Sequence, residues 1–388
     1  MRSNRKNLRV LACLDSFKGS LSSTEAGEAV RAGVTEAVPD AEVIVKTLAD
    51  GGEGTVRALC RENELRIVRA HDPLGREIDA VYGVITHGGH RTAVIETASA
   101  AGLTLLSDSE RDPMVASTYG LGEVIRAAID DGIRDFVIGL GGSATNDGGT
   151  GMLSALGFGF LNRDRKPVSS GARGLAEIES IDVSGVMPEL CECRFRAACD
   201  VDNPLCGEDG CSAVFAPQKG ARDEDIPVMD GWLGRFAGLS RDVFPDADPE
   251  FPGSGAAGGL GFAVRTFLRG ELLPGAGLII DATGLCDAVR DADIVVTGEG
   301  RLDAQSAMGK GPTAVSSLAR KHGKPCVAFA GCISDGAERC RELGIDAYFP
   351  IQRGIVCLEE AMKPDNARRN LSSAVCEVFR LIELLRNK

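Results

Sequence analysis

The sequence predicts an α/β protein in which a mixed α/β domain is inserted into a discontinuous, doubly wound parallel-sheet domain. Its 388 residues exceed what one hydrophobic core normally accommodates. Short apolar segments near both ends of the chain each lead into a polar, glycine-rich loop and then a helical pattern, which is typical of parallel strands. Between them the pattern changes to alternating strands. We therefore expect the parallel-sheet domain at residues 1–75 and 285–388, and the insertion at residues 76–284.

Composition limits the classes of partner. The net charge of −13 disfavours nucleic acid, and an aromatic content of 5% leaves few surfaces on which bases could stack. No segment is long and apolar enough to span a membrane. The 13 cysteines contain no CxxC pair and lack metal-site spacing. Reduced thiols in a cytoplasmic protein are the expectation.

The first strand-loop-helix unit begins the chain. Residues 8–14 form an apolar run that predicts a buried strand. Ser22 and Glu25 have the spacing of a capping box, so a helix should follow and end at Pro39. Ligands bind at the carboxyl edge of open α/β sheets. The loop at this edge carries polar side chains that suit a phosphate or a substrate: Asp15, Ser16 and Lys18.

A second unit of the same kind follows. Residues 43–49 predict a strand, and the next loop places Asp50 and Glu53 among glycines. Two carboxylates in such a loop suit a hydrated magnesium ion or a substrate hydroxyl. For Asp50 taken without Glu53, a role as the N-cap of the following helix explains the aspartate almost as well.

The pattern changes after residue 75. Residues 78–84 alternate between apolar and polar or small side chains, and a Gly-Gly turn at 88–89 leads into residues 91–96. This predicts an antiparallel hairpin, and hence a mixed sheet. Residues 117–131 have helical spacing.

A glycine-rich segment at residues 139–151 follows an apolar strand at 136–140. Backbone amides of such loops, here those of Gly141 and Gly142, form anion-binding concavities. The alternative is a flexible strand-to-helix loop. The polar side chains of the segment suit phosphate, magnesium or a sugar-like hydroxyl: Ser143, Thr145, Asn146 and Asp147.

Three further loops of the insertion carry polar or glycine-rich groups. Asp200 and Asn203 follow a β-like run, and Lys219 lies in a polar turn. Gly258 and Gly259 belong to a second glycine-rich loop that opens a helix. Phosphate binding at a helix N-terminus is one interpretation of this loop, and close helix packing on small residues is the other.

The parallel pattern returns near residue 292. Strands are predicted at 294–297, 326–330 and 347–351, and residues 371–385 form an amphipathic closing helix. With the two N-terminal strands, these would make a five-stranded doubly wound sheet. The loop after the first of them carries Arg301 and Asp303.

The loops favour phosphoryl transfer over other chemistry. No Walker loop is present, and residues 139–144 match a dinucleotide fingerprint only loosely. The loops supply backbone amides at glycines, lysine side chains and carboxylates, and they lack a group of histidines or cysteines that could carry out other chemistry. Phosphoryl transfer depends mainly on positioning and charge neutralisation by such groups.

Taken together, the motif segments of this chain resemble the type-1 glycerate kinase family over about residues 8–385. The segments are 15–20, 49–55, 139–151, 199–205, 217–220 and 297–303. The resemblance implies ATP- and Mg²⁺-dependent phosphorylation of D-glycerate to 2-phosphoglycerate. It also implies two α/β domains, one of them flavodoxin-like, with the active site in the cleft between them. Cys206, Cys211 and Ala216 depart from the family pattern without removing a charged or amide group.

Roles for single residues follow as hypotheses. Lys18 and the amides of the glycine-rich segment would hold phosphates, and Arg301 would bind the carboxylate of glycerate. The base would be Asp303 or Asp200. The remaining assignments are Asp50 and Glu53 as metal ligands, and Asn146 and Asp147 facing the glycerate hydroxyls or the metal.

Several alternatives stay open. Phosphorylation at the 3-hydroxyl is one, because the two hydroxyls lie one carbon apart. A nicotinamide-dependent hydroxy-acid dehydrogenase and a non-catalytic sugar-acid sensor are the others. The sequence does not decide between a monomer and a homodimer.

Overall fold

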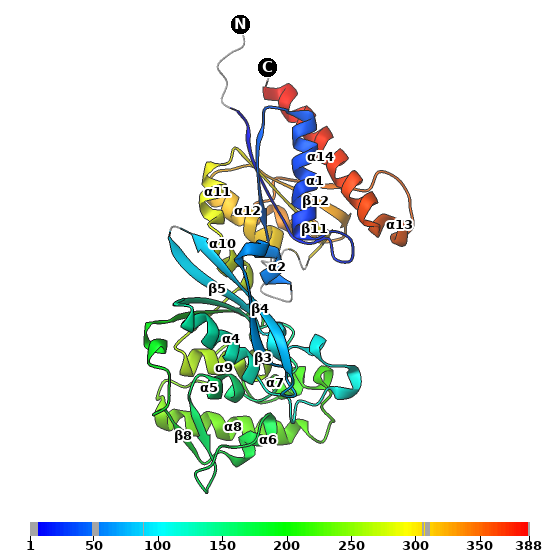
Figure 1. Ribbon diagram of the computed structural model, residues 1–388. Coiled ribbons are helices and arrows are strands. Elements are labelled where there is room, and N and C mark those ends of the chain that lie inside the picture. The colour runs from blue at the N-terminus through cyan, green and yellow to red at the C-terminus, as the bar shows by residue number, and fades with distance from the viewer. Residues whose placement is uncertain (1–6, 49–53, 88, 305, 307–310, 387–388) are drawn as a thin grey trace. The chain divides into compact units, whose positions relative to one another are not determined.

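The computed structural model describes residues 7–48, 54–87, 89–304, 306 and 311–386 (Figure 1). The chain divides into two compact units. The first consists of Met1–Asp50 and Ile279–Lys388, and the second of Gly51–Leu278. Within the described ranges, no helix combines the length and the apolar character needed to cross a membrane.

The first unit contains a five-stranded, fully parallel sheet in the order β13-β12-β11-β1-β2. This is the flavodoxin-like order, in which the chain starts near the middle and reverses direction between β1 and β11. The predicted doubly wound sheet is therefore confirmed. The strands are β1 (Arg9–Leu14), β2 (Glu42–Thr47), β11 (Ile294–Leu302), β12 (Cys326–Ile333) and β13 (Ala347–Pro350).

Helices cover both faces of this sheet because alternate strand residues point to opposite sides. Val10 and Leu14 of β1 pack with α1 (Ser23–Ala37) and α14 (Pro364–Arg386), which lie together in Figure 1. Leu11 belongs to the opposite core with α11 (Leu285–Asp291) and α12 (Gly311–Lys321). The short helix α13 (Leu358–Met362) precedes α14.

The capping box predicted for α1 is confirmed. The Oγ of Ser22 accepts a hydrogen bond from Glu25 N at 3.2 Å, and the Glu25 carboxylate accepts one from Ser22 N at 2.9 Å. These bonds satisfy amide groups that the helix itself leaves unpaired. They fix the point at which the loop after β1 ends.

The second unit contains a six-stranded mixed sheet in the order β10-β9-β6-β5-β4-β3. Strands β5, β6, β9 and β10 run parallel, whereas the β3–β4 and β4–β5 pairs are antiparallel. The predicted hairpin is the β4–β5 pair. The strands are β3 (Leu65–His71), β4 (Glu77–His87), β5 (His90–Glu96), β6 (Asp135–Gly139), β9 (Arg194–Ala198) and β10 (Glu271–Leu273), and β7 (Gly159–Leu161) pairs separately with β8 (Ser180–Asp182).

Helices of the second unit pack around a core rich in phenylalanine. Phe236 stacks on Phe267 with ring centroids 5.8 Å apart, and Phe262 meets Phe236 edge to face. The longest helix among the described residues of this unit is α8 (Ile226–Val243). The others are α2 (Thr55–Leu59), α3 (Ala98–Ala101), α4 (Tyr119–Asp130), α5 (Thr150–Ala155), α6 (Ala172–Glu177), α7 (Cys211–Phe215) and α9 (Ala256–Phe267), while α10 (Gly275–Ala282) spans the division between the units.

The first crossing between the units lies earlier in the chain than residue 75, where the sequence places it. Helix α2 packs against β4 and β5 through Val56 and Cys60. Strand β3 pairs along its whole length with β4. Residues 54–71 thus belong to the second unit: β3 is a strand of its mixed sheet, and α2 packs on that sheet.

Candidate active site

A cavity of about 520 Å³ lies at the carboxyl edge of the parallel sheet in the first unit. The loops after β1, β11 and β13 line it, together with the last residues of β11 and of β12, α13 and the start of α14. This is the crevice where ligands bind in open α/β sheets. Charged residues in the lining are Asp15, Lys18, Glu299, Arg301 and Asp303.

The loop after β1 contacts the carboxyl-terminal part of β11 because these two strands are neighbours in the sheet. Asp15 N donates a hydrogen bond to Gly298 O at 2.8 Å. A side chain at Gly298 would place a Cβ 2.0 Å from Phe329 O, so only glycine lets β11 lie this close to β12. The sequence-predicted residues Asp15, Ser16 and Lys18 are thereby brought next to Arg301 and Asp303. Strand β11 runs to Leu302, so Arg301 lies in the strand and not in the predicted loop, and Asp303 directly follows the strand.

Ser306 shapes the turn that presents Arg301 and Asp303. Its backbone N donates to Asp303 Oδ1 at 3.3 Å, and its Oγ accepts from Asp303 N at 3.2 Å. The same Oγ donates to Arg301 O at 3.3 Å. Arg301 is exposed and Asp303 is half-buried, so both side chains are accessible from the cavity.

Glu299 also lines this cavity, although it is not among the residues predicted from the sequence. Its Oε1 is buried and has no hydrogen-bond partner in the part of the chain that the structure describes. Burial raises the pKa of Glu299 to about 7, and the charges of Asp15 and Asp303 act in the same direction while Ser306 and Lys18 oppose them. The sequence feature that could have identified Glu299 is its position between two glycines in the motif at residues 297–303.

The predicted metal ligands Asp50 and Glu53 lie outside the described residues. In the described ranges, no group of three or more His, Cys, Asp or Glu side chains has the arrangement of a metal site. The assignment of Asp50 and Glu53 therefore stays a prediction.

A second group of sequence-predicted residues surrounds Lys219 in the second unit. Lys219 is only 2% exposed. Its Nζ donates to Ser143 Oγ at 2.9 Å and to Thr145 O at 2.7 Å. Burial lowers the pKa of Lys219 to about 8, although Cys211 and Asp147 favour the charged form. The lysine thus ties the glycine-rich segment to the turn that follows α7.

Asp147 lies inside this segment and is fully buried. Its carboxylate accepts hydrogen bonds from Thr118 N, Thr118 Oγ1, Gly149 N and Gly151 N, at 2.8 to 3.2 Å. Burial raises the pKa of Asp147, while these hydrogen bonds favour its ionised form. This geometry is that of a side chain that organises the backbone around it.

Asn146 is also fully buried, and its Nδ2 donates to Ser212 Oγ at 2.9 Å. By contrast, Gly141 and Gly142 are exposed. The side-chain groups of the segment therefore point into the protein, whereas these two glycines present backbone to solvent.

The remaining predicted residues of the second unit are placed as follows. Gly258 packs on the glycine-rich segment, since a Cβ there would lie 2.0 Å from Thr145 O, and Gly259 lies against Gly148. Asp200 Oδ1 accepts from Gly275 N at 3.0 Å, and Asn203 Nδ2 donates to Asp209 O at 2.8 Å. These contacts hold loops together, and no ligand role follows from them.

Comparison with known proteins gives a consistent result. A sequence model of the glycerate kinase family matches residues 10–383. The chain is 40% identical over 365 residues to a glycerate kinase of Halalkalibacterium halodurans, covering 92% of this chain and 96% of that protein. It is 39% identical over 375 residues to the glycerate 2-kinase of Escherichia coli strain K12, covering 95% and 98% of the two chains.

A solved structure agrees with these relatives. It is a crystal structure from Salmonella typhimurium LT2, assigned to glycerate kinase 2, with a TM-score of 0.88 and 38% identity. The match covers 99% of this chain and 100% of the other. Because the family match spans nearly the whole sequence and the relatives align over nearly their full length, this chain belongs to the glycerate kinase family.

Proposed function

We propose that this protein transfers the γ-phosphoryl group of ATP to the 2-hydroxyl of D-glycerate. Family membership supports the kinase activity, and the name of the Escherichia coli relative, glycerate 2-kinase, supports the position. The observation that carries the proposal is the cavity at the sheet's switch point. It combines Lys18 and Arg301 with three carboxylates, which is the inventory of a phosphoryl-transfer site.

Each charged group of the cavity has a role in this proposal. Lys18 neutralises charge on the phosphoryl group that is transferred. Arg301 offers a planar pair of donors to the glycerate carboxylate. Asp303 orients and deprotonates the attacking hydroxyl, and Asp200 in the second unit is the alternative base. The N-terminus of α12 begins at Gly311 in the cavity wall and favours bound anions.

The carboxylates of the cavity fit a magnesium ion. The buried, unpartnered Oε1 of Glu299 is an oxygen donor of the kind Mg²⁺ prefers. In kinase sites one or two carboxylates usually hold Mg²⁺ together with substrate phosphates, so a complete protein ligand set is not required. Glu299 and Asp15 would hold the ion, with Asp50 and Glu53 as further candidates. When bound, Mg²⁺ neutralises charge on the phosphates.

In the second unit, we propose that the exposed amides of Gly141 and Gly142 contact phosphate. Lys219, Ser143, Thr145, Asn146 and Asp147 then act by holding that segment in shape, as their burial indicates. Ligand roles for Asn203, Gly258 and Gly259 remain predictions.

The product of the reaction tests this proposal. The protein is incubated with ATP, Mg²⁺ and D-glycerate, and the product is offered to enolase alone or to phosphoglycerate mutase and enolase together. A signal with enolase alone identifies 2-phosphoglycerate. A signal that requires the mutase would identify 3-phosphoglycerate and overturn the assigned position, and no signal in either arm would overturn the activity.

A further inference from the structure

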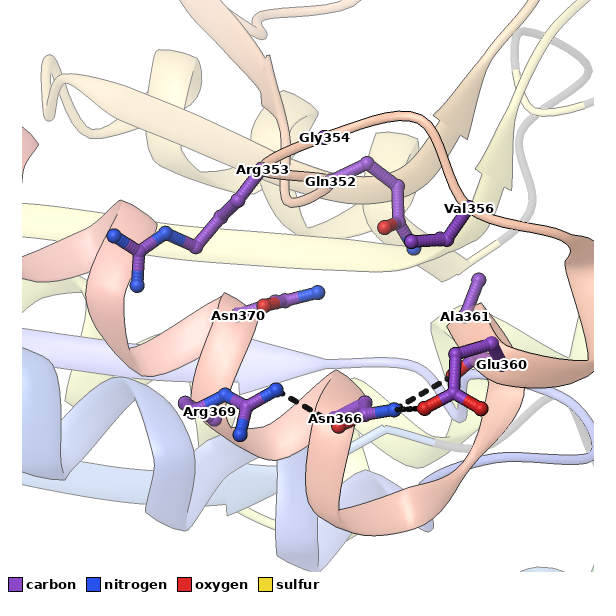
Figure 2. Close-up of a pocket in the computed structure, with 9 residues that line it drawn as sticks. All are labelled: Gln352, Arg353, Gly354, Val356, Glu360, Ala361, Asn366, Arg369 and Asn370. Carbon is purple, nitrogen blue, oxygen red and sulfur yellow. Dashed lines mark hydrogen bonds between the residues drawn. The ribbon is translucent and has the colours of Figure 1, made fainter.

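A second cavity adjoins the candidate active site within the first unit. Its volume is about 450 Å³, within the range of small-molecule sites. It lies between the loop after β13 and helices α13 and α14 (Figure 2). Gln352 and Ala361 line both cavities, so the two are direct neighbours at the carboxyl edge of the sheet.

One wall of this cavity is fixed by hydrogen bonds among its own side chains. Asn366 Nδ2 donates to Glu360 O at 2.9 Å and to Glu360 Oε1 at 2.7 Å. Arg369 Nη2 donates to Asn366 Oδ1 at 2.8 Å, as the dashed lines in Figure 2 show. Glu360 is also paired with Lys363. These groups satisfy one another and hold α13 against α14.

Two side-chain amides are left over for a ligand. Gln352 and Asn370 are half-buried, and Figure 2 shows both directed into the space between the loop and α14. In the part of the chain that the structure describes, neither amide makes a hydrogen bond. A side-chain amide offers a donor and an acceptor side by side, which matches the amino group and adjacent ring nitrogen of adenine. Val356 and Ala361 add apolar surface for the face of the base.

The cavity is also locally basic in an acidic protein. Arg353 and Arg369 line it, while its one carboxylate, Glu360, is already paired with Lys363. The chain as a whole carries a net charge of −13. A local positive balance in such a chain favours a ligand that is anionic as a whole, as a nucleotide is.

We propose that this second cavity is the nucleoside subsite for ATP, with the purine on Gln352 and Asn370 and the triphosphate extending into the neighbouring cavity toward Lys18. The proposal rests on the proposed kinase function. It assigns binding of the base to residues of the β13 loop and α14. It predicts that affinity for the base and affinity for the phosphates depend on different residues.

Calorimetric titration with two probes tests this division. ADP carries the base, whereas inorganic tripolyphosphate carries phosphates alone. Asn370→Ala should weaken ADP binding about tenfold, the loss of one or two hydrogen bonds, and leave tripolyphosphate binding unchanged. Gln352→Ala should weaken ADP binding to a similar extent; because Gln352 lines both cavities, the comparison with tripolyphosphate is made with Asn370→Ala. Asn63→Ala, an exposed asparagine of the second unit, is the matched control and should change neither.

The outcomes separate the subsite from the kinase function. Unchanged ADP affinity in folded Asn370→Ala and Gln352→Ala would overturn the subsite, as would an equal loss of ADP and tripolyphosphate binding in Asn370→Ala. Turnover of D-glycerate by the wild-type protein is measured alongside. Its absence would refute the kinase function, whereas a loss specific to ADP in Asn370→Ala would still support a nucleoside subsite.

Discussion

The substitution Asp147→Asn removes a charge from the interior of the second unit while keeping the shape of the side chain. It separates two roles for this residue, as a ligand of substrate or metal and as an organiser of the glycine-rich segment. In the wild-type protein, Oδ2 accepts from Thr118 N at 2.9 Å, from Thr118 Oγ1 at 2.8 Å and from Gly151 N at 3.2 Å. Oδ1 accepts from Gly149 N at 3.0 Å.

The expected cost follows from these four bonds. The asparagine oxygen can replace Oδ2, but three hydrogen bonds to a charged acceptor become bonds to a neutral one, at a loss of roughly 1 kcal/mol each. The asparagine NH₂ then faces Gly149 N, which leaves a buried donor without an acceptor at a cost of about 1–3 kcal/mol. The variant no longer bears the cost of burying a charge, and this gain offsets part of the loss. The net loss in unfolding free energy should be about 3 kcal/mol.

Urea unfolding followed by tryptophan fluorescence measures this loss in the relevant unit. The protein has one tryptophan, Trp232, which packs on the core of the second unit. With an m-value of about 3 kcal/mol/M, the midpoint should fall by roughly 1 M. The exposed Asp164→Asn in the same unit is the control and should change stability by less than about 0.5 kcal/mol. An unchanged midpoint for Asp147→Asn, particularly with lost activity, would refute the structural role and restore the ligand role.

Three further predictions concern the charged groups of the two units. Asp303→Asn should lower kcat by about 10²–10⁴ with an unchanged unfolding midpoint; a near-wild-type rate would place the base elsewhere. Arg301→Lys should raise KM for D-glycerate and leave KM for ATP unchanged, because lysine loses the paired donors; an effect on ATP alone would contradict the assignment. Lys219 has a folded-state pKa of about 8 against an ordinary 10.5, so the unfolded chain binds more protons between these values. The unfolding free energy of the wild type relative to Lys219→Met should therefore rise by roughly 2 kcal/mol from pH 7 to 9.5, and a flat difference would show that burial does not perturb this lysine.

The parallel sheet was predictable because each of its strands can be recognised from its own short apolar segment. Strand β1 is buried on both faces, with Val10 and Leu14 on one side and Leu11 on the other, so it appears as an unbroken apolar run. Strand β3 gives a weaker signal. It lies at the edge of its sheet, and Ile67 is 72% exposed. Its membership of the mixed sheet depends on pairing with β4, which its own residues do not encode.

Residues that line the candidate site could be selected by residue type, but their surroundings in the fold could not be predicted. Lys18, Arg301 and Asp303 stand out because polar side chains follow predicted strands, and the adjacency of β1 and β11 brings them together. Glu299 was missed because its burial depends on residues distant in sequence. Asp147 has the type and place of a ligand, yet Thr118 of a preceding segment supplies two of its four hydrogen bonds. Such tertiary contacts decide between a binding role and a structural one.

The most direct test of the account compares wild type and Lys18→Met in one assay of ADP release from ATP with Mg²⁺. The wild-type protein should release ADP only when D-glycerate is present. Lys18→Met should lose at least about 10²-fold in kcat while remaining folded, because the loss of one preorganised charge at the transferred phosphoryl group has an effect of this size. Absence of glycerate-dependent ADP release in the wild type, or an undiminished rate in Lys18→Met, would contradict the claim that this cavity is the active site of a glycerate kinase.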